Sequence, residues 1–105
     1  MNKRNIILIG MPGAGKSSVG VILAKVLGYE FIDTDLVIQH REKRLLREII
    51  ADEGNEGFLA IENEVNATLE ANKSVIAPGG SAIYGKEAME HFKEIGTIVY
   101  LKLSY

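Results

Sequence analysis

Residues 10–17 read GMPGAGKS and match the pattern G-x-x-x-x-G-K-[ST] at every fixed position. The apolar run IILI at residues 6–9 precedes them and is typical of a buried parallel strand. We therefore predict a strand, a glycine-rich loop and a helix that begins near Lys16. The helix is expected to pack against the core with the apolar residues that recur at helical spacing, which are Val19, Ile22, Leu23, Val26 and Leu27.

A loop of this kind binds phosphate because its backbone N–H groups point inward and the next helix adds its unpaired N–H groups. We predict that the nucleotide is bound by six residues: Gly13, Ala14, Gly15, Lys16, Ser17 and Ser18. Lys16 is expected to reach the β- and γ-phosphates and to act in catalysis, and the Ser17 hydroxyl to ligate a metal ion. The predicted cofactors are ATP and Mg²⁺.

The amino-acid composition of the chain excludes several classes of binding partner. The 105 residues fit one domain, and 12 basic against 14 acidic residues leave a net charge of −2. The chain therefore has no excess of positive charge that would attract nucleic acid or an anionic membrane. The chain has no cysteine, which excludes a disulfide framework and a cysteine-based metal site. No apolar stretch is long enough for a signal peptide or a membrane span, so we expect a cytoplasmic protein with a small-molecule substrate.

Strand patterns alternate with helix patterns along the chain. We predict strands at residues 6–9, 29–32, 74–77 and 97–101. We predict helices at residues 16–27, 45–53, 56–71 and 85–94, and one more helix that follows the second strand and is capped by Thr34 or Asp35. The alternation predicts one α/β domain over residues 1–105, with three layers and a parallel sheet of about four strands. The connection between the second and third strands is too long for a plain crossover. We interpret it as a helical, substrate-binding lobe at about residues 34–72.

Two carboxylates follow the second predicted strand, in the run Asp33-Thr34-Asp35. The carboxyl ends of strands line the ligand crevice in such sheets, so both side chains are expected near the γ-phosphate. Asp33 is a candidate for holding Mg²⁺, directly or through water, because the third strand ends without a carboxylate. Asp35 is a candidate for orienting an attacking hydroxyl or accepting its proton. The alternative for Asp35 is simple helix capping.

A second glycine turn, Pro78-Gly79-Gly80-Ser81, follows the third predicted strand. It belongs to the same rim of the sheet as the two aspartates. We predict that Gly79 and Gly80 contact a substrate hydroxyl or carboxylate through their backbone N–H groups. The alternative is an ordinary turn between a strand and a loop.

Four pieces of the chain together resemble the shikimate kinase family of small P-loop kinases. They are residues 10–17, the run FIDTD at 31–35, the spacing Gly54…Phe58…Glu62, and Pro78-Gly79-Gly80. The resemblance implies the strand order 2-3-1-4 and transfer of the ATP γ-phosphoryl group to the 3-hydroxyl of shikimate. It also implies a metal-linked role for Asp33, contact of Asp35 with the shikimate hydroxyl, and contact of Gly79 and Gly80 with shikimate.

The chain departs from this family at three informative positions. Leu59 stands where the family has an arginine that pairs with the shikimate carboxylate, Ser81 replaces a glycine, and Asn55 replaces a glutamate. An apolar side chain cannot make a bidentate, charge-assisted pair. Three functions therefore stay open: a kinase for shikimate, a kinase for another small hydroxylated metabolite, and a nucleotide-binding module with little catalysis. Arg44 and Arg47 are alternative partners for an anionic substrate group.

The family continues past the position of Tyr105 with an arginine-bearing lid, a fifth strand and a final helix. We expect the sequence to be either a fragment of a longer protein or a reduced relative, with reduced turnover in the absence of the lid arginine. The resemblance also implies that the fifth strand would pair with the fourth. Ile98, Val99 and Leu101 would then lie on an open apolar edge, so we predict self-association through this edge.

Overall fold

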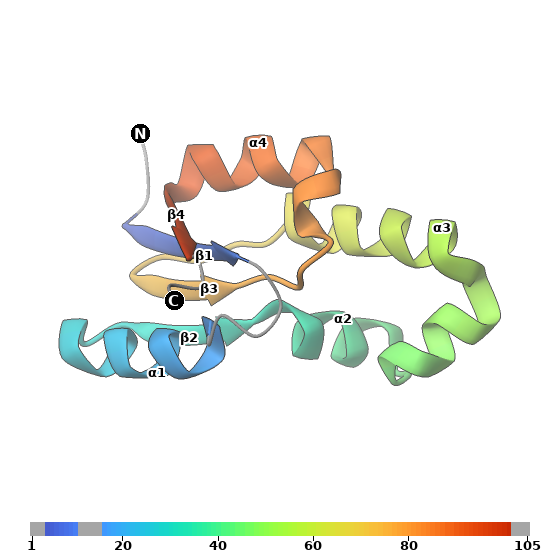
Figure 1. The fold of residues 1–105 in the computed structure, drawn as a ribbon, viewed down its shortest axis with the longest axis horizontal. Helices are drawn as coiled ribbons and strands as arrows, with labels where there is room; N and C mark the ends of the chain where they lie inside the picture. Colours follow the sequence, from blue (N-terminus) through green and yellow to red (C-terminus); the bar gives the residue numbers. More distant parts are fainter. Residues whose placement is uncertain (1–3, 11–15, 102–105) are drawn as a thin grey trace, which may run out of the picture.

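The computed structural model describes residues 4–10 and 16–101, and it describes residues 16 and 17 by their backbone alone. Figure 1 shows the elements in chain order. They are β1 (Asn5–Gly10), α1 (Lys16–Leu27), β2 (Glu30–Asp33), α2 (Thr34–Glu42), α3 (Leu46–Ala67), β3 (Ser74–Ala77), the 3-10 helix η1 (Ala82–Tyr84), α4 (Lys86–Ile95) and β4 (Gly96–Leu101).

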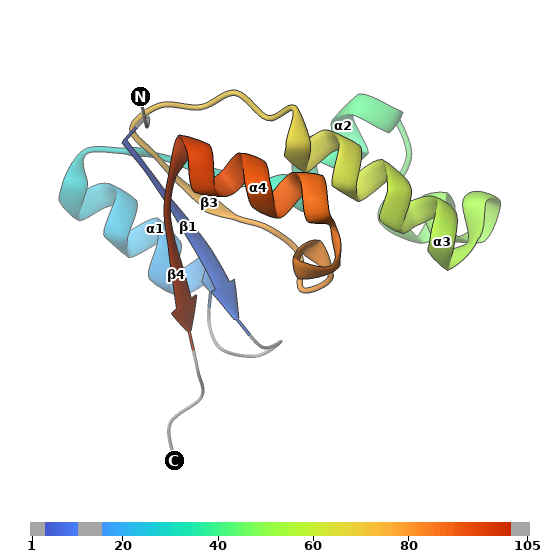
Figure 2. The same cartoon turned by 90° about the horizontal axis from the view of Figure 1, so that it is seen from above.

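The four strands form a parallel sheet in the order β2-β3-β1-β4. In the centre of the sheet Ile7 of β1 lies opposite Ile76 of β3 and Ile98 of β4. This order confirms the predicted α/β fold, and each predicted strand is present to within one or two residues. Figure 2 shows β1 and β4 side by side with their ends at the same edge.

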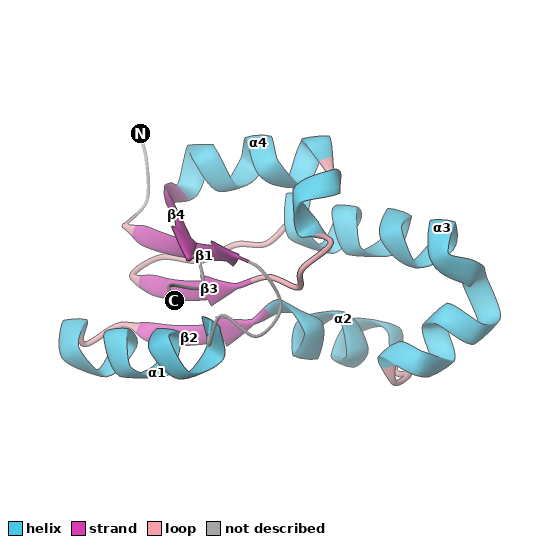
Figure 3. Ribbon diagram, viewed as in Figure 1, coloured by secondary structure: helices cyan, strands magenta, loops and turns pink. Residues whose placement is uncertain are grey.

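Helices cover both faces of the sheet, which gives three layers (Figures 1 and 3). One face packs Ile7, Ile9 and Ile76 against α4. The other face packs Leu8 and Val75 against α1. Adjacent residues of β1 therefore point to opposite faces, as the strand geometry requires, and both are buried. Within the described residues, no helix is long and apolar enough to cross a membrane.

Of the five residues that apolar spacing predicts on the buried face of α1, only Leu23 packs against the core, and it is half-buried. Ile22 is 64% and Val26 77% exposed, and Val19 and Leu27 are exposed as well. The buried residues are Gly20 and Ala24, one turn apart. A Cβ on Gly20 would lie 2.6 Å from Phe31 Cε1, so the helix comes close to the sheet through its small residues. Close approach of the helix backbone decides which face is buried here, and four of the five larger apolar residues remain exposed.

Helices α2 and α3 extend beyond the sheet on one side (Figure 1). They enclose a small core of their own, made of Ile38, Ile49 and Val65. Helix α3 consists of two helical parts that meet at Gly54, where φ is 75° and ψ is 175°. The prediction of two helices separated at Gly54 describes this break, although the second part ends at Ala67 and not near residue 71.

The buried side chain of Asn5 connects three segments at the start of β1. Its Nδ2 donates hydrogen bonds to the carbonyl oxygens of Ala71, at 2.9 Å, and Ile95, at 2.8 Å. Its Oδ1 accepts a hydrogen bond from the Ser74 N–H, at 3.0 Å. All three polar positions of the amide are therefore satisfied inside the protein, as a buried amide requires.

Candidate active site

The predicted phosphate site begins where β1 ends at Gly10, and α1 starts at Lys16. Gly13, Ala14 and Gly15 lie outside the described residues, and the side chains of Lys16 and Ser17 are likewise not described. Ser18 is exposed in the first turn of α1. A helix that starts at Lys16 directs its unpaired first-turn N–H groups toward this region. This geometry fits phosphate groups, because helix N-termini favour anions.

Asp33 and Asp35 lie where β2 ends and α2 begins, and Asp33 rather than Thr34 or Asp35 caps the helix. The Oδ1 atom of Asp33 accepts a hydrogen bond of 2.9 Å from the Asp35 N–H. The predicted cap was therefore wrong by one or two residues, because Asp33 still has the extended backbone that an N-cap requires. Capping is thus not the role of the Asp35 side chain.

Asp33 fits a metal-linked role, because the capping hydrogen bond uses only its Oδ1 atom. A carboxylate oxygen is the kind of ligand that Mg²⁺ takes, usually together with waters and substrate phosphates. Among the described residues, no group of three or more acidic or histidine side chains forms a metal site.

Gly79 lies between two carboxyl groups. A Cβ at this position would lie 2.8 Å from Asp35 Oδ1 and 3.1 Å from Glu62 Oε2. A side chain here would therefore force the Asp35 carboxylate to shift, and glycine leaves room for its close approach. The structure thus brings the predicted residues Asp35 and Gly79 together, and it adds Glu62 to them.

Glu62 is the residue that sequence reasoning missed, since it entered only as part of a spacing. It is 2% exposed, and its Oε1 accepts a hydrogen bond of 2.7 Å from the Ser81 hydroxyl. Its Oε2 is buried with no hydrogen-bond partner in the part of the chain that the structure describes. Burial raises the pKa of Glu62, the Ser81 hydrogen bond lowers it, and the charge of Asp35 raises it further.

A signal for Glu62 does exist in the sequence. The residue lies four positions after Phe58 and three before Val65, on the apolar face predicted for this helix. A carboxylate on such a face must be buried, and buried carboxylates are rare outside functional or paired positions.

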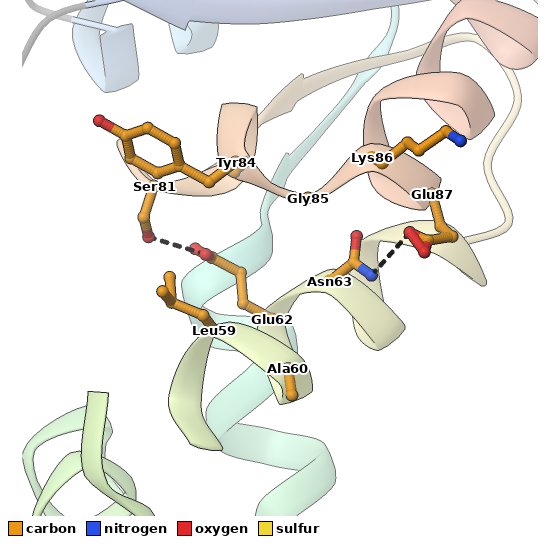
Figure 4. Close-up of a pocket in the computed structure, with 10 residues that line it drawn as sticks. Leu59, Ala60, Glu62, Asn63, Ser81, Tyr84, Gly85, Lys86 and Glu87 are labelled. Atoms are coloured by element: carbon orange, nitrogen blue, oxygen red, sulfur yellow. Dashed lines mark hydrogen bonds between the residues drawn. The ribbon is translucent and has the colours of Figure 1, made fainter. Parts of the chain in front are cut away.

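A cavity of about 360 Å³ lies between α3 and the segment formed by η1 and the start of α4 (Figure 4). Leu59, Glu62 and Ser81 line one part of it, and Lys86 and Glu87 line another. The side chain of Asn63 supports this wall, because its Oδ1 accepts a hydrogen bond of 3.0 Å from the Ala88 N–H at the start of α4. Two departures from the family pattern, Leu59 and Ser81, thus share one cavity.

The arginines of the α2–α3 region are mostly engaged with carboxylates. Arg44 pairs with Glu42 and Asp52 at 3.1 Å each and with Glu53 at 3.3 Å. Arg41 pairs with Glu64. Arg44 is therefore neutralised by its own neighbours and does not suit the predicted capture of an anionic substrate group. Arg47 is exposed, and its role in such capture stays a prediction.

A parallel sheet of order 2-3-1-4, a helix N-terminus after its first strand and carboxylates at the same edge define a P-loop domain of the kinase type. The chain belongs to the shikimate kinase family, because the family model described as shikimate kinase matches residues 12–105.

Individual relatives agree with this assignment. The chain is 39% identical to shikimate kinase 2 of Yersinia enterocolitica over 101 residues, which cover 96% of this chain and 58% of the relative. The chain thus spans little more than half the length of the curated relatives it matches.

Solved structures match the fold. Shikimate kinase from Acinetobacter baumannii, in complex with shikimate, superposes with a TM-score of 0.86 at 36% identity, over 97% of this chain and 57% of that one. The enzyme from Aquifex aeolicus gives a TM-score of 0.81 at 33% identity, over 96% and 61%. The APS kinase CysC of Mycobacterium tuberculosis, at 21% identity, covers 96% of this chain and 76% of that one, with a TM-score of 0.63, and shares the fold alone.

Proposed function

We propose that this protein is a kinase that transfers the γ-phosphoryl group of ATP to a hydroxyl of a small metabolite. The observation that supports this most is the Asp35 carboxylate, which lies against the Gly79 turn where β2 and β3 end. A carboxylate in this position suits an acceptor hydroxyl bound between the strand ends and the α2–α3 lobe, which we assign to residues 34–72 of a single domain.

Each predicted residue has a role in this proposal. Residues 13–18 bind the nucleotide phosphates, with Lys16 at the β- and γ-phosphates, and Ser17 and Asp33 hold Mg²⁺. The metal ion, when bound, neutralises phosphate charge. Asp35 orients the acceptor hydroxyl and accepts its proton as the new O–P bond forms. The N–H groups of Gly79 and Gly80 hold the acceptor in place.

Shikimate is the acceptor that membership of the family favours. A second candidate is another small hydroxylated metabolite, which the cavity position of Leu59 favours, since this side chain cannot pair with a carboxylate. A nucleotide-binding module with little catalysis is the remaining alternative. We place the activity in the cytoplasm, where ATP is available.

The first test is calorimetric titration of Mg-ADP into the 105-residue chain, with and without Lys16→Ala. We expect micromolar binding that falls at least about tenfold in Lys16→Ala, because a charged contact to phosphate is removed. Lys25→Ala is the matched control, since Lys25 is exposed in the last turn of the same helix. It should bind as the native chain does.

Release of ADP in the presence of shikimate, or of another polyol, then separates the three functions. Turnover with shikimate supports the first and turnover with a different acceptor the second. Binding without any turnover favours the nucleotide-binding module. A native chain that does not bind Mg-ADP would contradict the proposal as a whole.

A further inference from the structure

Two buried asparagines of this fold differ in how their amide groups are satisfied. Asn5 is 3% exposed, and all three polar positions of its amide bond to backbone groups of the protein. Asn66, near the end of α3, is 0% exposed, and neither its Oδ1 nor its Nδ2 has a hydrogen-bond partner among the described residues. Burial of an unbonded amide is unfavourable, so Asn66 requires partners that the side chains around it do not supply.

Two further buried side chains share this property within the part of the chain that the structure describes. Thr34 is 0% and Glu62 2% exposed, and Thr34 Oγ1 and Glu62 Oε2 have no hydrogen-bond partner there. All these atoms are already enclosed by the protein around them. A group that packs onto the outside of the molecule cannot reach them, so a partner for them must be small and must lie inside.

Helix α3 places Asn66 beside Glu62. The two residues are one turn apart on the same face of the helix, and helical side chains lean toward the preceding turn, so the Asn66 amide lies over the turn that carries Glu62. Glu62 itself lies just beyond the end of β3. Its Oε2 is 3.1 Å from the position of a Cβ on Gly79, and its Oε1 accepts the hydrogen bond from Ser81 that Figure 4 shows.

Thr34 reaches the same place from α2. It follows Asp33, which lies opposite Ala77 at the end of β3. One turn further along the same face of α2, Ile38 shares a core with Val65 of α3. The face of α2 that carries Thr34 is therefore turned toward α3. Figure 1 shows α2 starting where β2 ends, so Thr34 lies at the junction of the strand ends with the two helices.

We propose that this junction is a binding site for internal water, held by Thr34, Glu62 and Asn66. A water molecule offers two donors and two acceptors, so it can donate to Glu62 Oε2 and Asn66 Oδ1 and accept from Asn66 Nδ2 and the Thr34 hydroxyl. A cation in this site leaves the Asn66 N–H groups unbonded, and an anion meets the Glu62 carboxyl group. Water suits all three side chains.

The site gives Thr34 and Asn66 a positioning role. Thr34 lies between Asp33 and Asp35, the two aspartates assigned above to the metal ion and to the acceptor hydroxyl. Water held between Thr34 and Asn66 joins the first turn of α2 to α3, and thereby fixes the backbone that carries both aspartates. The inference concerns hydration inside the fold, so it does not depend on the identity of the acceptor or on the kinase function proposed above.

The test measures nuclear Overhauser effects between water and the side-chain amide protons of the native 105-residue chain. Water that stays bound while the molecule tumbles gives cross-peaks of the opposite sign to those of short-lived surface water, and the rotating-frame measurement separates both from proton exchange. We expect cross-peaks of bound water at the Asn66 amide. The Asn5 amide, which is buried but bonded to the protein, should show none, and the exposed Asn55 should contact only short-lived water.

Two substitutions then ask whether Thr34 and Asn66 share the same water. Thr34→Val removes the hydroxyl with little change of shape, so the water cross-peaks of Asn66 should weaken. Asn66→Leu removes the amide, and the shifts in denaturation midpoint of the two variants should not add in the double variant, because both disturb one site. Thr97→Val is the matched control, since Thr97 is exposed on β4 and its shift should add to that of Asn66→Leu.

An Asn66 amide without bound-water cross-peaks in the native chain would overturn this inference, and so would a direct hydrogen bond from Asn66 to Thr34 or Glu62 in a crystal structure. Additive shifts for Thr34→Val and Asn66→Leu would overturn the shared site. If Asn66→Leu does not fold, the cross-peaks of the native chain and of Thr34→Val decide the question. Failure of the chain to bind Mg-ADP would contradict the proposed function and leave this inference standing.

Discussion

Burial of the Glu62 carboxyl group makes the free energy of folding less favourable, which is not the case for most buried residues of this fold. Its carboxyl group is buried, and within the described residues the structure gives it a hydrogen bond from Ser81 and no ion pair. Burial therefore disfavours the ionised form relative to an exposed glutamate, which is the direction of its raised pKa. Such a cost is typical of positions kept for binding rather than for stability.

We predict that Glu62→Gln stabilises the chain at neutral pH. The folded pKa of Glu62 is raised, so ionisation weakens the folded state as pH rises above the ordinary glutamate pKa. Glutamine keeps an acceptor for Ser81 and cannot ionise. The gain in melting temperature should therefore be largest near pH 8 and vanish toward pH 4, as measured by thermal unfolding across that range.

Glu90→Gln is the control for this measurement, because Glu90 is exposed on α4. Its effect on the melting temperature should be small at every pH. A gain for Glu62→Gln that is larger in acid than at neutral pH would show that the carboxyl group is stabilised in its ionised form, contrary to the structure.

Helix α4 begins without a cap of its own. Its N-cap residue is Gly85, which has no side chain to bond the first-turn N–H groups, and Asn63 of α3 supplies the acceptor for Ala88 instead. A Cβ on Gly85 would collide with the Asn63 side chain, so the glycine makes room for this remote cap. The cap also joins α3 to α4 at the cavity wall.

Asn63→Ala should lower the free energy of unfolding by about 0.5–2 kcal/mol, the usual cost of losing a helix cap. Chemical denaturation, compared with the native chain, measures this loss. Glu90→Ala, an exposed change on the capped helix α4, is expected to stay within about 0.5 kcal/mol. Equal effects of the two substitutions would mean that Asn63 does not cap α4.

The elements were predictable from sequence where a local signal decides them. The P-loop pattern predicted the strand before it and the helix that starts at Lys16, and the glycine at position 54 marks the predicted break between two helices. The helix predicted at 85–94 is present as α4, which buries Ala88, Phe92 and Ile95. The buried face of α1 was not predictable, because it depends on how closely Gly20 approaches Phe31 in space. The pairing of Glu62 with Ser81 joins residues 19 positions apart, and no local pattern contains it.

Among the residues that the structure describes, apolar side chains are exposed on two surfaces that matter for association. One is the α1 face around Ile22 and Val26, and the other is β4. Of the three residues predicted on the β4 edge only Val99 is exposed, whereas Ile98 and Leu101 are half-buried against the core, and Tyr100 is exposed as well. In the described sheet β4 pairs with β1 alone and forms an edge. Exposed apolar edges invite pairing with another chain, so the predicted self-association through β4 stays a prediction with a defined surface.

We expect the 105-residue chain to associate as its concentration rises, as measured by light scattering. Tyr100→Lys should reduce association, because charge on an edge strand opposes pairing with a second copy. Ile22→Lys is the matched comparison, since Ile22 and Tyr100 are 64% and 62% exposed. Association that survives Tyr100→Lys but not Ile22→Lys would move the contact to α1, and a chain that stays monomeric would contradict the prediction.

The hydrogen bonds of the Asn5 side chain determine which parts of the protein unfold together. It holds backbone groups that lie 66 to 90 residues away, so β1, the start of β3 and the end of α4 must separate together. The α2–α3 lobe has its own core and an exposed Arg41–Glu64 ion pair within it. Its opening must break the Asn63 cap on α4 but not the hydrogen bonds of Asn5. Amide protons of the central sheet should therefore exchange with solvent only through global unfolding, whereas those of the lobe exchange through a cheaper, local event. The α2–α3 lobe would then fluctuate while the central sheet stays closed.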